Sequence, residues 1–232
     1  MARLSPTYAD RRDELKTYFD RTAVDAWAKL TSTAKVSGIR ATVRAGRDEM
    51  RATLLSYLPD DLAGARLLDA GCGTGALAVE TARRGADVVA TDLSEQLVGL
   101  ARERSPGDVA IDWRVGDMLA EGLGEFDVVV AMDSLIHYRT ADMVAALSAI
   151  APRTRRAILI TFAPATLALS AMHSVGRLFP RGDRAPAIEP VAERALRRQI
   201  ARAPALAGWR VGRTHRVSKG FYTSQAMELV PA

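Results

Sequence analysis

The chain has 232 residues, of which 48% are hydrophobic and 25% charged, and its formal net charge is +5. This length and composition predict one globular domain with a modest appendage and exclude a fibrous or disordered chain. No apolar run approaches the roughly 20 residues that a membrane span needs, and the charged N-terminus has no stretch typical of a secretory signal. We therefore expect a cytoplasmic protein that is at most peripheral to a membrane.

Cysteine and histidine are scarce. Cys72 is the single cysteine, which excludes an internal disulfide and a cysteine-rich metal cluster. The three histidines are scattered along the chain. We expect no metal site.

Charge is divided unevenly along the chain. Residues 66–150 carry a net charge of −7 (7 basic against 14 acidic residues), whereas residues 151–232 carry +10 (14 against 4). Residues 1–65 carry +2 (11 against 9). A basic tail suits a partner or substrate with negative charge, although solvated arginines on helix surfaces explain it equally well.

The pattern of apolar residues predicts two helices, then a regular alternation of strands and helices. Residues 9–30 and 36–58 have the helical period, and Pro59 closes the second helix. Strands are then expected at 66–69, 87–91, 111–115, 126–132 and 157–162, and helices at 75–84, 94–104 and 142–150. Continuous apolar runs such as VVVAM are typical of parallel strands covered on both faces. The prediction is an α/β fold, Rossmann-like, with a doubly wound, mostly parallel sheet.

The alternation stops after Phe162. Residues 165–179 read as a long apolar helix, followed by a Pro-rich loop, so an insertion is expected at 163–190. A basic helix at 189–203 and two strands at 209–217 and 220–230, joined by a tight turn, complete the chain. The expected organisation is a helical lid at 1–58 and a ligand-binding core at 59–232.

The stretch LLDAGCGTG at 67–75 predicts a nucleotide site. Its glycines permit positive φ angles and let the main chain approach a ligand closely. Gly71, Gly73 and Ala76 also fit the dinucleotide fingerprint, so the glycines leave the nucleotide open. Asp69 indicates which nucleotide is bound, because a carboxylate at the strand end would repel a pyrophosphate but attract the α-ammonium of S-adenosylmethionine (SAM).

Further acidic residues follow the next strands. Asp92 ends the second strand, where it can accept hydrogen bonds from both ribose hydroxyls. Asp117 follows the third strand and can accept from the adenine amino group, with Leu93 and Met118 against the ring. Three carboxylates at successive strand ends predict a SAM-binding site, and the acidic middle segment suits a cationic ligand.

Together with DSLIHY at 133–138, these residues give residues 60–165 a resemblance to the class I SAM-dependent methyltransferases. The resemblance implies a cofactor site that comprises, beyond the residues above, Gly71, Cys72, Gly73, Gly75 and Asp133. It says little of the methyl acceptor.

Other stretches resemble one family of that class, the magnesium-protoporphyrin IX O-methyltransferases of chlorophyll and bacteriochlorophyll synthesis. They are TYFDRTAVDAW at 17–27, MDSLIHY at 132–138, ITFAPAT at 160–166, GRLFP at 176–180 and GFYTS at 220–224. The resemblance implies methyl esterification of a porphyrin propionate, and the order of the pathway implies transient contact with magnesium chelatase. Peripheral association with photosynthetic membranes would also suit this pathway.

A propionate is ionised near neutral pH, so its methylation needs no general base. His137 is expected to donate a hydrogen bond to the spectator oxygen of the propionate, for which a neutral imidazole would suffice. Tyr18, on the N-terminal helix, is chosen over Phe19 as the second catalytic residue because it has a hydroxyl. The apolar residues of 167–179 are expected to line the porphyrin pocket, and His173 is a remote candidate for a magnesium ligand.

Three alternatives remain open. A methyltransferase acting on a quinone or another small hydroxyl or carbon acceptor would share residues 60–165, and there His137 would be the base. The basic pI near 9.7 raises the question of nucleic-acid modification. DSLIHY lacks the prolines typical of that chemistry, so we expect no nucleic-acid partner. A porphyrin carrier without catalysis would not need Asp69 and Asp92.

Overall fold

The computed structural model describes residues 6–21, 38–165 and 187–232, and within them it confirms the predicted α/β fold with a doubly wound, mostly parallel sheet. One seven-stranded sheet has the strand order β3-β2-β1-β4-β5-β7-β6. The first five strands run parallel, whereas β7 is antiparallel to both its neighbours. The strands are β1 Arg66–Ala70, β2 Asp87–Asp92, β3 Ile111–Val115, β4 Phe126–Ala131, β5 Thr154–Phe162, β6 Trp209–Lys219 and β7 Tyr222–Pro231.

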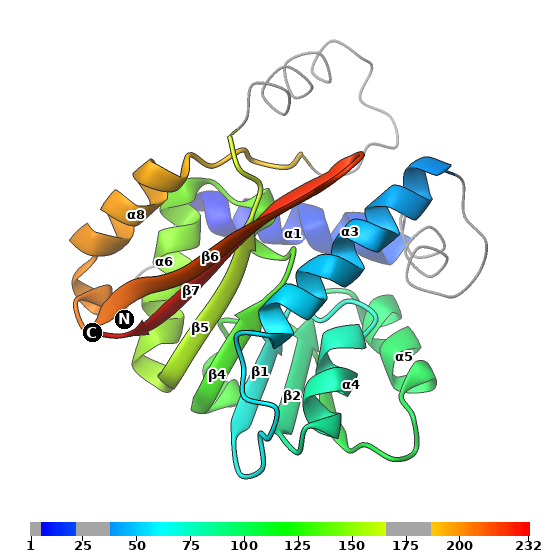
Figure 1. Ribbon diagram of the computed structural model, residues 1–232. Coiled ribbons are helices and arrows are strands. Elements are labelled where there is room, and N and C mark those ends of the chain that lie inside the picture. The colour runs from blue at the N-terminus through cyan, green and yellow to red at the C-terminus, as the bar shows by residue number, and fades with distance from the viewer. Residues whose placement is uncertain (1–5, 22–37, 166–186) are drawn as a thin grey trace.

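Helices cover both faces of the sheet (Figure 1). Successive side chains of a strand point to opposite faces of the sheet, so each strand contributes to two separate hydrophobic cores. Leu68 packs with α6 and α8 on one face, and Leu67 packs with α3 and α4 on the other. Every residue of β4 is buried, and its residues 128–131 form a continuous apolar run, as expected of a strand covered on both faces. The helices are α1 Pro6–Arg21, α3 Gly38–Leu55, α4 Ala76–Arg83, α5 Glu95–Arg104, α6 Thr140–Ile150 and α8 Glu193–Arg202.

Most predicted strands and helices are confirmed, with shifted ends. The strand predicted at 157–162 begins at Thr154, and the two last strands meet at a turn of Gly220 and Phe221. The first helix begins three residues before the predicted start, at Pro6. The predicted residues 22–30, most of the helix at 165–179 and His173 lie outside the described residues.

The helix predicted at 189–203 is wrong over its first four residues. α8 begins at Glu193, and the chain before it is extended. Val191 donates its backbone N–H to Ala163 and accepts one from Ala165, in a short parallel bridge beside β5. Pro190 explains the error, because the residue before a proline is driven from the helical region.

The two N-terminal helices differ in what they contact. α3 packs along the β6–β7 hairpin, and Met50 and Leu54 are fully buried there. Gly46 lies so close to Tyr222 that a side chain at this position would collide with the tyrosine ring. α1 instead packs against α5, at the carboxyl ends of the parallel strands. α3 thus packs into the core beside the sheet, whereas α1 lies over the carboxyl ends of the parallel strands, and a helical lid at 1–58 stays a prediction.

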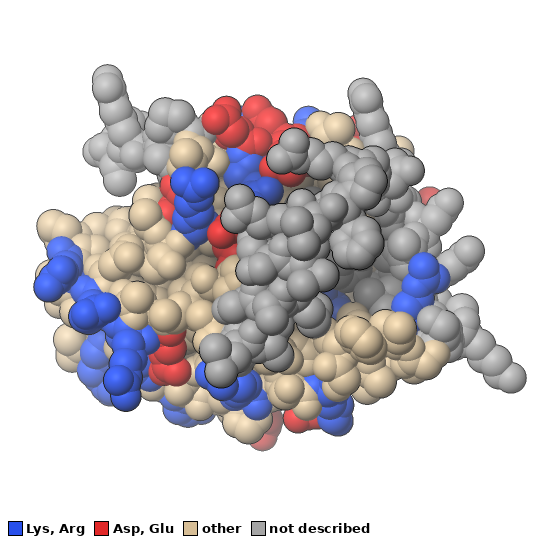
Figure 2. Space-filling view, turned by 90° about the horizontal axis from the view of Figure 1, so that it is seen from above, with Lys and Arg blue, Asp and Glu red and all other residues tan. Residues whose placement is uncertain are grey.

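Basic side chains gather on the side of the molecule where α8 lies (Figure 2). Arg194, Arg198 and Arg202 are exposed along that helix. None of the helices in the described ranges is both long and apolar enough to span a bilayer.

Candidate active site

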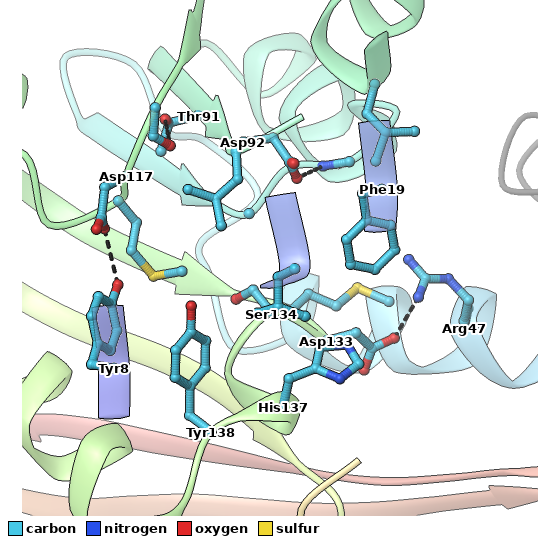
Figure 3. Close-up of a pocket in the computed structure, with 18 residues that line it drawn as sticks. Tyr8, Phe19, Arg47, Thr91, Asp92, Asp117, Asp133, Ser134, His137 and Tyr138 are labelled. Carbon is cyan, nitrogen blue, oxygen red and sulfur yellow. Dashed lines mark hydrogen bonds and ion pairs between the residues drawn. The ribbon is translucent and has the colours of Figure 1, made fainter. Parts of the chain in front are cut away.

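A pocket opens at the carboxyl ends of β1, β2 and β4, and α1 covers one side of it (Figure 3). The space between its walls, including the open mouth, is about 690 Å³. Eight predicted site residues line it: Gly71, Gly73, Asp92, Leu93, Asp117, Met118, Asp133 and His137. Four others do not: Asp69, Cys72, Gly75 and Tyr18.

The glycine turn after β1 forms the floor of the pocket. Gly71 has a φ of 87°, and a side chain there would collide with Ser134. Gly75 has a φ of 80° and is the N-cap of α4, where it packs against Trp113. Gly75 therefore shapes the turn without lining the pocket. Cys72 is also set back from the pocket, and burial raises the pKa of its thiol.

Asp69 lies beneath this turn and is only 2% exposed. Its carboxylate accepts a hydrogen bond from the backbone of Ala78 in α4, while its Oδ2 has no hydrogen-bond partner. Burial, reinforced by the nearby charge of Asp92, raises the pKa of Asp69 to about 7. A buried carboxylate with an unpartnered oxygen, behind the pocket floor, fits a cationic ligand because a positive charge would offset its desolvation.

Asp92 joins the end of β2 to the glycine turn. Its Oδ2 accepts the backbone N–H of Gly73 at 2.8 Å, and its Oδ1 accepts that of Ser94 at 3.0 Å. Burial raises the pKa of Asp92, and the backbone donors oppose this shift. Because each carboxylate oxygen has a second lone pair, Asp92 can still accept hydrogen bonds from a ligand's hydroxyl groups.

Asp117 is held by residues of α1. Its Oδ1 accepts the Tyr8 hydroxyl at 2.9 Å and the backbone N–H of Leu119 at 2.9 Å. Arg12 approaches Oδ2 at 3.5 Å. The Tyr8 ring stacks on Tyr138 with 4.8 Å between ring centroids, and burial raises the pKa of both hydroxyls. α1 thus closes this end of the pocket through Tyr8, which the sequence did not single out.

Asp133 has an unusual backbone conformation and a dense set of donors. Its φ of 53° is rare for a residue other than glycine. Arg47 contacts its Oδ2 at 2.8 Å, and the Tyr222 hydroxyl lies 3.1 Å from both carboxylate oxygens. Thr161 and Ser224 also donate to Oδ1, at 3.2 and 3.4 Å. Side chains of the protein therefore engage this carboxylate, and Asp133 fixes Arg47 at the pocket wall (Figure 3).

Arg47 is the single Lys or Arg among the described residues that line the pocket. The guanidinium group is suited to binding a carboxylate through two parallel hydrogen bonds. The sequence did not single out Arg47 because it lies on α3, 86 positions before Asp133.

His137 ends the short helix η2 (Leu135–His137) and is buried beside the Phe19 ring, with 6.2 Å between ring centroids. Its Nδ1 lies 3.3 Å from the backbone oxygen of Ala187. A carbonyl can only accept, so this contact requires the proton on Nδ1, and a neutral ring then has an Nε2 that accepts. With this tautomer, donation from Nε2 to a substrate requires the imidazolium form, and the role of His137 stays a prediction.

The pKa of His137 is lowered, mainly by burial, and the charge of Arg11 adds to this shift. The Ala187 carbonyl and the carboxylates of Asp133 and Glu14 oppose it. The ring is therefore neutral in the free protein at neutral pH, and a bound anion would favour its protonation.

Tyr18 is half-buried and does not line the pocket, and burial raises the pKa of its hydroxyl. Phe19 lines the pocket in its place, and the two rings meet edge to face at 5.2 Å between centroids. On a helix, neighbouring side chains point about 100° apart, so one of the two must turn away from the pocket. A direct role for Tyr18 therefore stays a prediction.

The residues present fit SAM. Four carboxylates, those of Asp69, Asp92, Asp117 and Asp133, lie in or directly behind the pocket wall. The buried Oδ2 of Asp69 and Oγ of Ser134 have no hydrogen-bond partner within the described parts of the chain. A ligand with an ammonium group and several polar groups would satisfy such atoms, whereas a pyrophosphate would be repelled by the carboxylates.

Comparisons with known proteins agree with this site. A family described as "Magnesium-protoporphyrin IX methyltransferase C-terminus" matches residues 131–231, and one described as "Methyltransferase domain" matches residues 67–156. The magnesium-protoporphyrin O-methyltransferase of Rhodobacter capsulatus is 49% identical over 227 residues, covering 97% of this chain and 98% of the relative.

A crystal structure of magnesium protoporphyrin IX methyltransferase from Synechocystis PCC 6803 with bound SAH superposes with a TM-score of 0.80 at 29% identity, covering 95% of this chain and 99% of that chain. The ubiquinone biosynthesis O-methyltransferase of Xanthomonas oryzae is 41% identical over 133 residues, about half of each chain (53% and 55%). The chain therefore belongs to the magnesium-protoporphyrin O-methyltransferase family and is a SAM-dependent O-methyltransferase.

Proposed function

We propose that this chain transfers the methyl group of SAM to a propionate carboxylate of magnesium protoporphyrin IX, giving the monomethyl ester in chlorophyll or bacteriochlorophyll biosynthesis. The observation that carries the proposal is the 49% identity, over nearly the whole of both chains, to the Rhodobacter magnesium-protoporphyrin O-methyltransferase. The matched region covers 97% of this chain and 98% of the relative.

When bound, SAM supplies a methyl group made electrophilic by a positively charged sulfur. Asp92 would accept hydrogen bonds from the ribose hydroxyls, and Asp117 from the adenine amino group, with Leu93 and Met118 against the ring. Asp69 would offset the charge of the α-ammonium group from beneath the glycine turn. Gly71 and Gly73 let the main chain approach the ligand, while Cys72 and Gly75 support the turn.

Arg47 would pair with a carboxylate of a ligand, either that of the methionine moiety or the propionate. Asp133 orients Arg47 and so acts on the ligand through it. Kinetics can distinguish the two carboxylates. Loss of Arg47 would raise KM for SAM if Arg47 binds the methionine carboxylate, and KM for the porphyrin if it binds the propionate.

The reaction balances without a general base. A propionate oxygen forms a bond to the methyl carbon, and the bond between that carbon and sulfur breaks, leaving a neutral thioether and an ester. Opposite charges cancel, so a pocket that excludes water favours the step. Alignment of donor and acceptor by the pocket can contribute about 7–11 kcal/mol.

The imidazolium form of His137 would bind the propionate through a hydrogen bond. Since Nδ1 is committed to Ala187, Nε2 donates to the spectator oxygen after the ring has gained a proton. Binding of the substrate carboxylate is then linked to proton uptake. Proton transfer from an uncharged propionic acid to a neutral imidazole would give the same pair of imidazolium and propionate.

A second candidate function is O-methylation of a phenol or quinol. The specific observation in its favour is the acceptor Nε2 of a neutral His137, which is the geometry of a general base for a hydroxyl group. The similarity of half the chain to a ubiquinone biosynthesis O-methyltransferase points the same way.

The test is an assay of the purified chain with radiolabelled SAM, against magnesium protoporphyrin IX and a panel of phenols and quinols. We expect label in an alkali-labile porphyrin monomethyl ester and none in the phenols. Transfer to phenols without porphyrin ester would overturn the proposal and establish the second candidate.

Where the protein works is also a proposal. We infer that it is a cytoplasmic protein that receives its substrate from magnesium chelatase, because that enzyme's product is this enzyme's substrate. The exposed arginines of α8 would suit a peripheral contact with an anionic membrane (Figure 2). Flotation with anionic and neutral vesicles, and a pull-down with the chelatase, test the two contacts separately.

A further inference from the structure

We propose that Arg11 is a positioning residue for methyl transfer, because its guanidinium joins helix α1 to the peptide of His137 and to the extended segment 187–192. The proposal rests on the proposed function of His137. Arg11 does not line the pocket, so it acts through His137 rather than on the substrate.

The guanidinium of Arg11 has three partners on three parts of the chain. Its Nε donates to the backbone oxygen of His137 at 2.9 Å. Its Nη2 lies 3.2 Å from Glu189, and its Nη1 lies 2.7 Å from Glu14, one turn further along α1. The Arg11 side chain is only 18% exposed, so these contacts are largely shielded from water.

The segment that contains Glu189 holds the adjacent peptide, on the other side of His137. The backbone N–H of Glu189 donates to the oxygen of Ile136 at 2.9 Å, and the Ala187 oxygen accepts from Nδ1 of His137. Two consecutive carbonyls and the ring of His137 are thus fixed by α1 and by residues 187–189. Arg11 is the side chain that connects these two clamps.

The chemistry of the guanidinium makes this role specific. Its planar fork can bond a carbonyl and a carboxylate in fixed directions at once, whereas a lysine ammonium is a point charge without this geometry. A partly exposed ion pair contributes little to stability, but a shift of about 1 Å in a group that orients a substrate can cost roughly 100-fold in rate. Loss of Arg11 should therefore affect turnover far more than folding.

Arg11 also acts on the protonation of His137. It faces the ring together with the carboxylates of Asp133 and Glu14 and the Ala187 carbonyl, and of these four groups it alone lowers the pKa of the ring. Removal of its charge should raise the pKa of His137. A residue that only stabilised α1 would leave this pKa unchanged.

The experiment compares Arg11→Gln, Arg11→Lys, Glu189→Ala and the double variant Arg11→Gln/Glu189→Ala with the wild type. Lys16→Gln is the matched control, because Lys16 is an exposed cation on the same helix. We expect kcat to fall at least tenfold in Arg11→Gln and less in Arg11→Lys and Glu189→Ala, with KM for SAM unchanged. The double variant should be no worse than Arg11→Gln, since both residues act in one clamp.

Two further measurements do not depend on the substrate. In Arg11→Gln, the NMR titration of His137, assigned with His137→Gln, should move to higher pH, and hydrogen exchange at the Glu189 amide should accelerate. Wild-type values for both, or additive losses of kcat in the double variant, would overturn the proposal. If the wild-type protein does not methylate magnesium protoporphyrin, the proposed function fails, and these two measurements still test the clamp.

Discussion

The two ring nitrogens of His137 have different partners, and this asymmetry determines how the residue can act. Nδ1 faces a backbone oxygen, and Nε2 is left for the ligand. A lowered pKa keeps the ring neutral until an anion arrives. The same residue can thus serve as the donor for a carboxylate or as the base for a hydroxyl, and pH separates the two.

We predict that KM for magnesium protoporphyrin rises with pH between about 6 and 8.5, because above the pKa of the ring each pH unit makes the imidazolium about tenfold scarcer. In His137→Gln the amide donates at every pH, so KM should lose this dependence while kcat/KM falls at low pH. Steady-state kinetics across the pH range measure both effects. His215→Gln, on exposed β6, is the control, and an equal pH dependence in His137→Gln would contradict the prediction.

A second prediction concerns Arg47. Substitution by Gln removes the cation beside Asp133, whose side chain is 5% exposed, and should destabilise the protein by about 2 kcal/mol. It should also raise KM for one carboxylate-bearing ligand at least tenfold. Arg51→Gln, one turn along α3 and paired with the exposed Asp48, should change neither quantity. Urea unfolding and kinetics with each substrate varied in turn provide the readouts.

At the scale of elements, the main question is whether α3 belongs to a lid or to the core. Placement of residues 1–58 in a lid would make α3 separable from the sheet, whereas Met50 and Leu54 are fully buried against it. The contact with Tyr222 also ties α3 to the residue that bonds Asp133. Packing of α3 therefore supports both the core and the pocket wall.

We predict that Leu54→Ala lowers the free energy of unfolding by about 2–5 kcal/mol, as expected for a cavity in a packed core. Unfolding should remain a single transition if α3 and the sheet form one cooperative unit. Urea denaturation followed by circular dichroism and by tryptophan fluorescence tests this. A loss below about 0.5 kcal/mol, or two separate transitions, would instead indicate a detachable lid.

The sequence predicted the elements that have strong local signals. Continuous apolar runs located β4 and β5, and the spacing of Asp69, Asp92 and Asp117 placed carboxylates at neighbouring strand ends. Contacts across long separations were not predictable, such as Tyr8 with Asp117, 109 positions apart. The choice of Tyr18 over Phe19 depended on the rotation of α1, which the polarity of two adjacent residues does not reveal.

At the scale of the whole molecule, the acidic segment 66–150 contains the pocket wall, and its charge affects stability as well as binding. Asp69 has its pKa raised to about 7 by burial, from an ordinary value near 3.8. The folded protein therefore holds a proton that the unfolded chain releases as pH rises above about 4. Stability from this group is present at low pH and is lost as pH rises towards 7.

We predict that Asp69→Asn removes this loss, so that its stability relative to the wild type increases by about 2–3 kcal/mol between pH 5 and pH 8. Thermal unfolding of both proteins at several pH values measures the difference. SAH, which carries the α-ammonium group, should stabilise the wild type more at pH 8 than at pH 5. A constant difference between the two proteins across this range would show that Asp69 keeps an ordinary pKa.

The position of β7 has a consequence for the order in which the sheet can assemble. The last strand in the sequence lies between β5 and β6, and it supplies the only hydrogen-bonded link between them in the described sheet. Because β7 follows both neighbours in the chain, the facing edges of β5 and β6 stay unpaired until residues 222–231 join the sheet. Substitutions that keep β7 from docking would therefore expose both edges and leave the chain prone to aggregation.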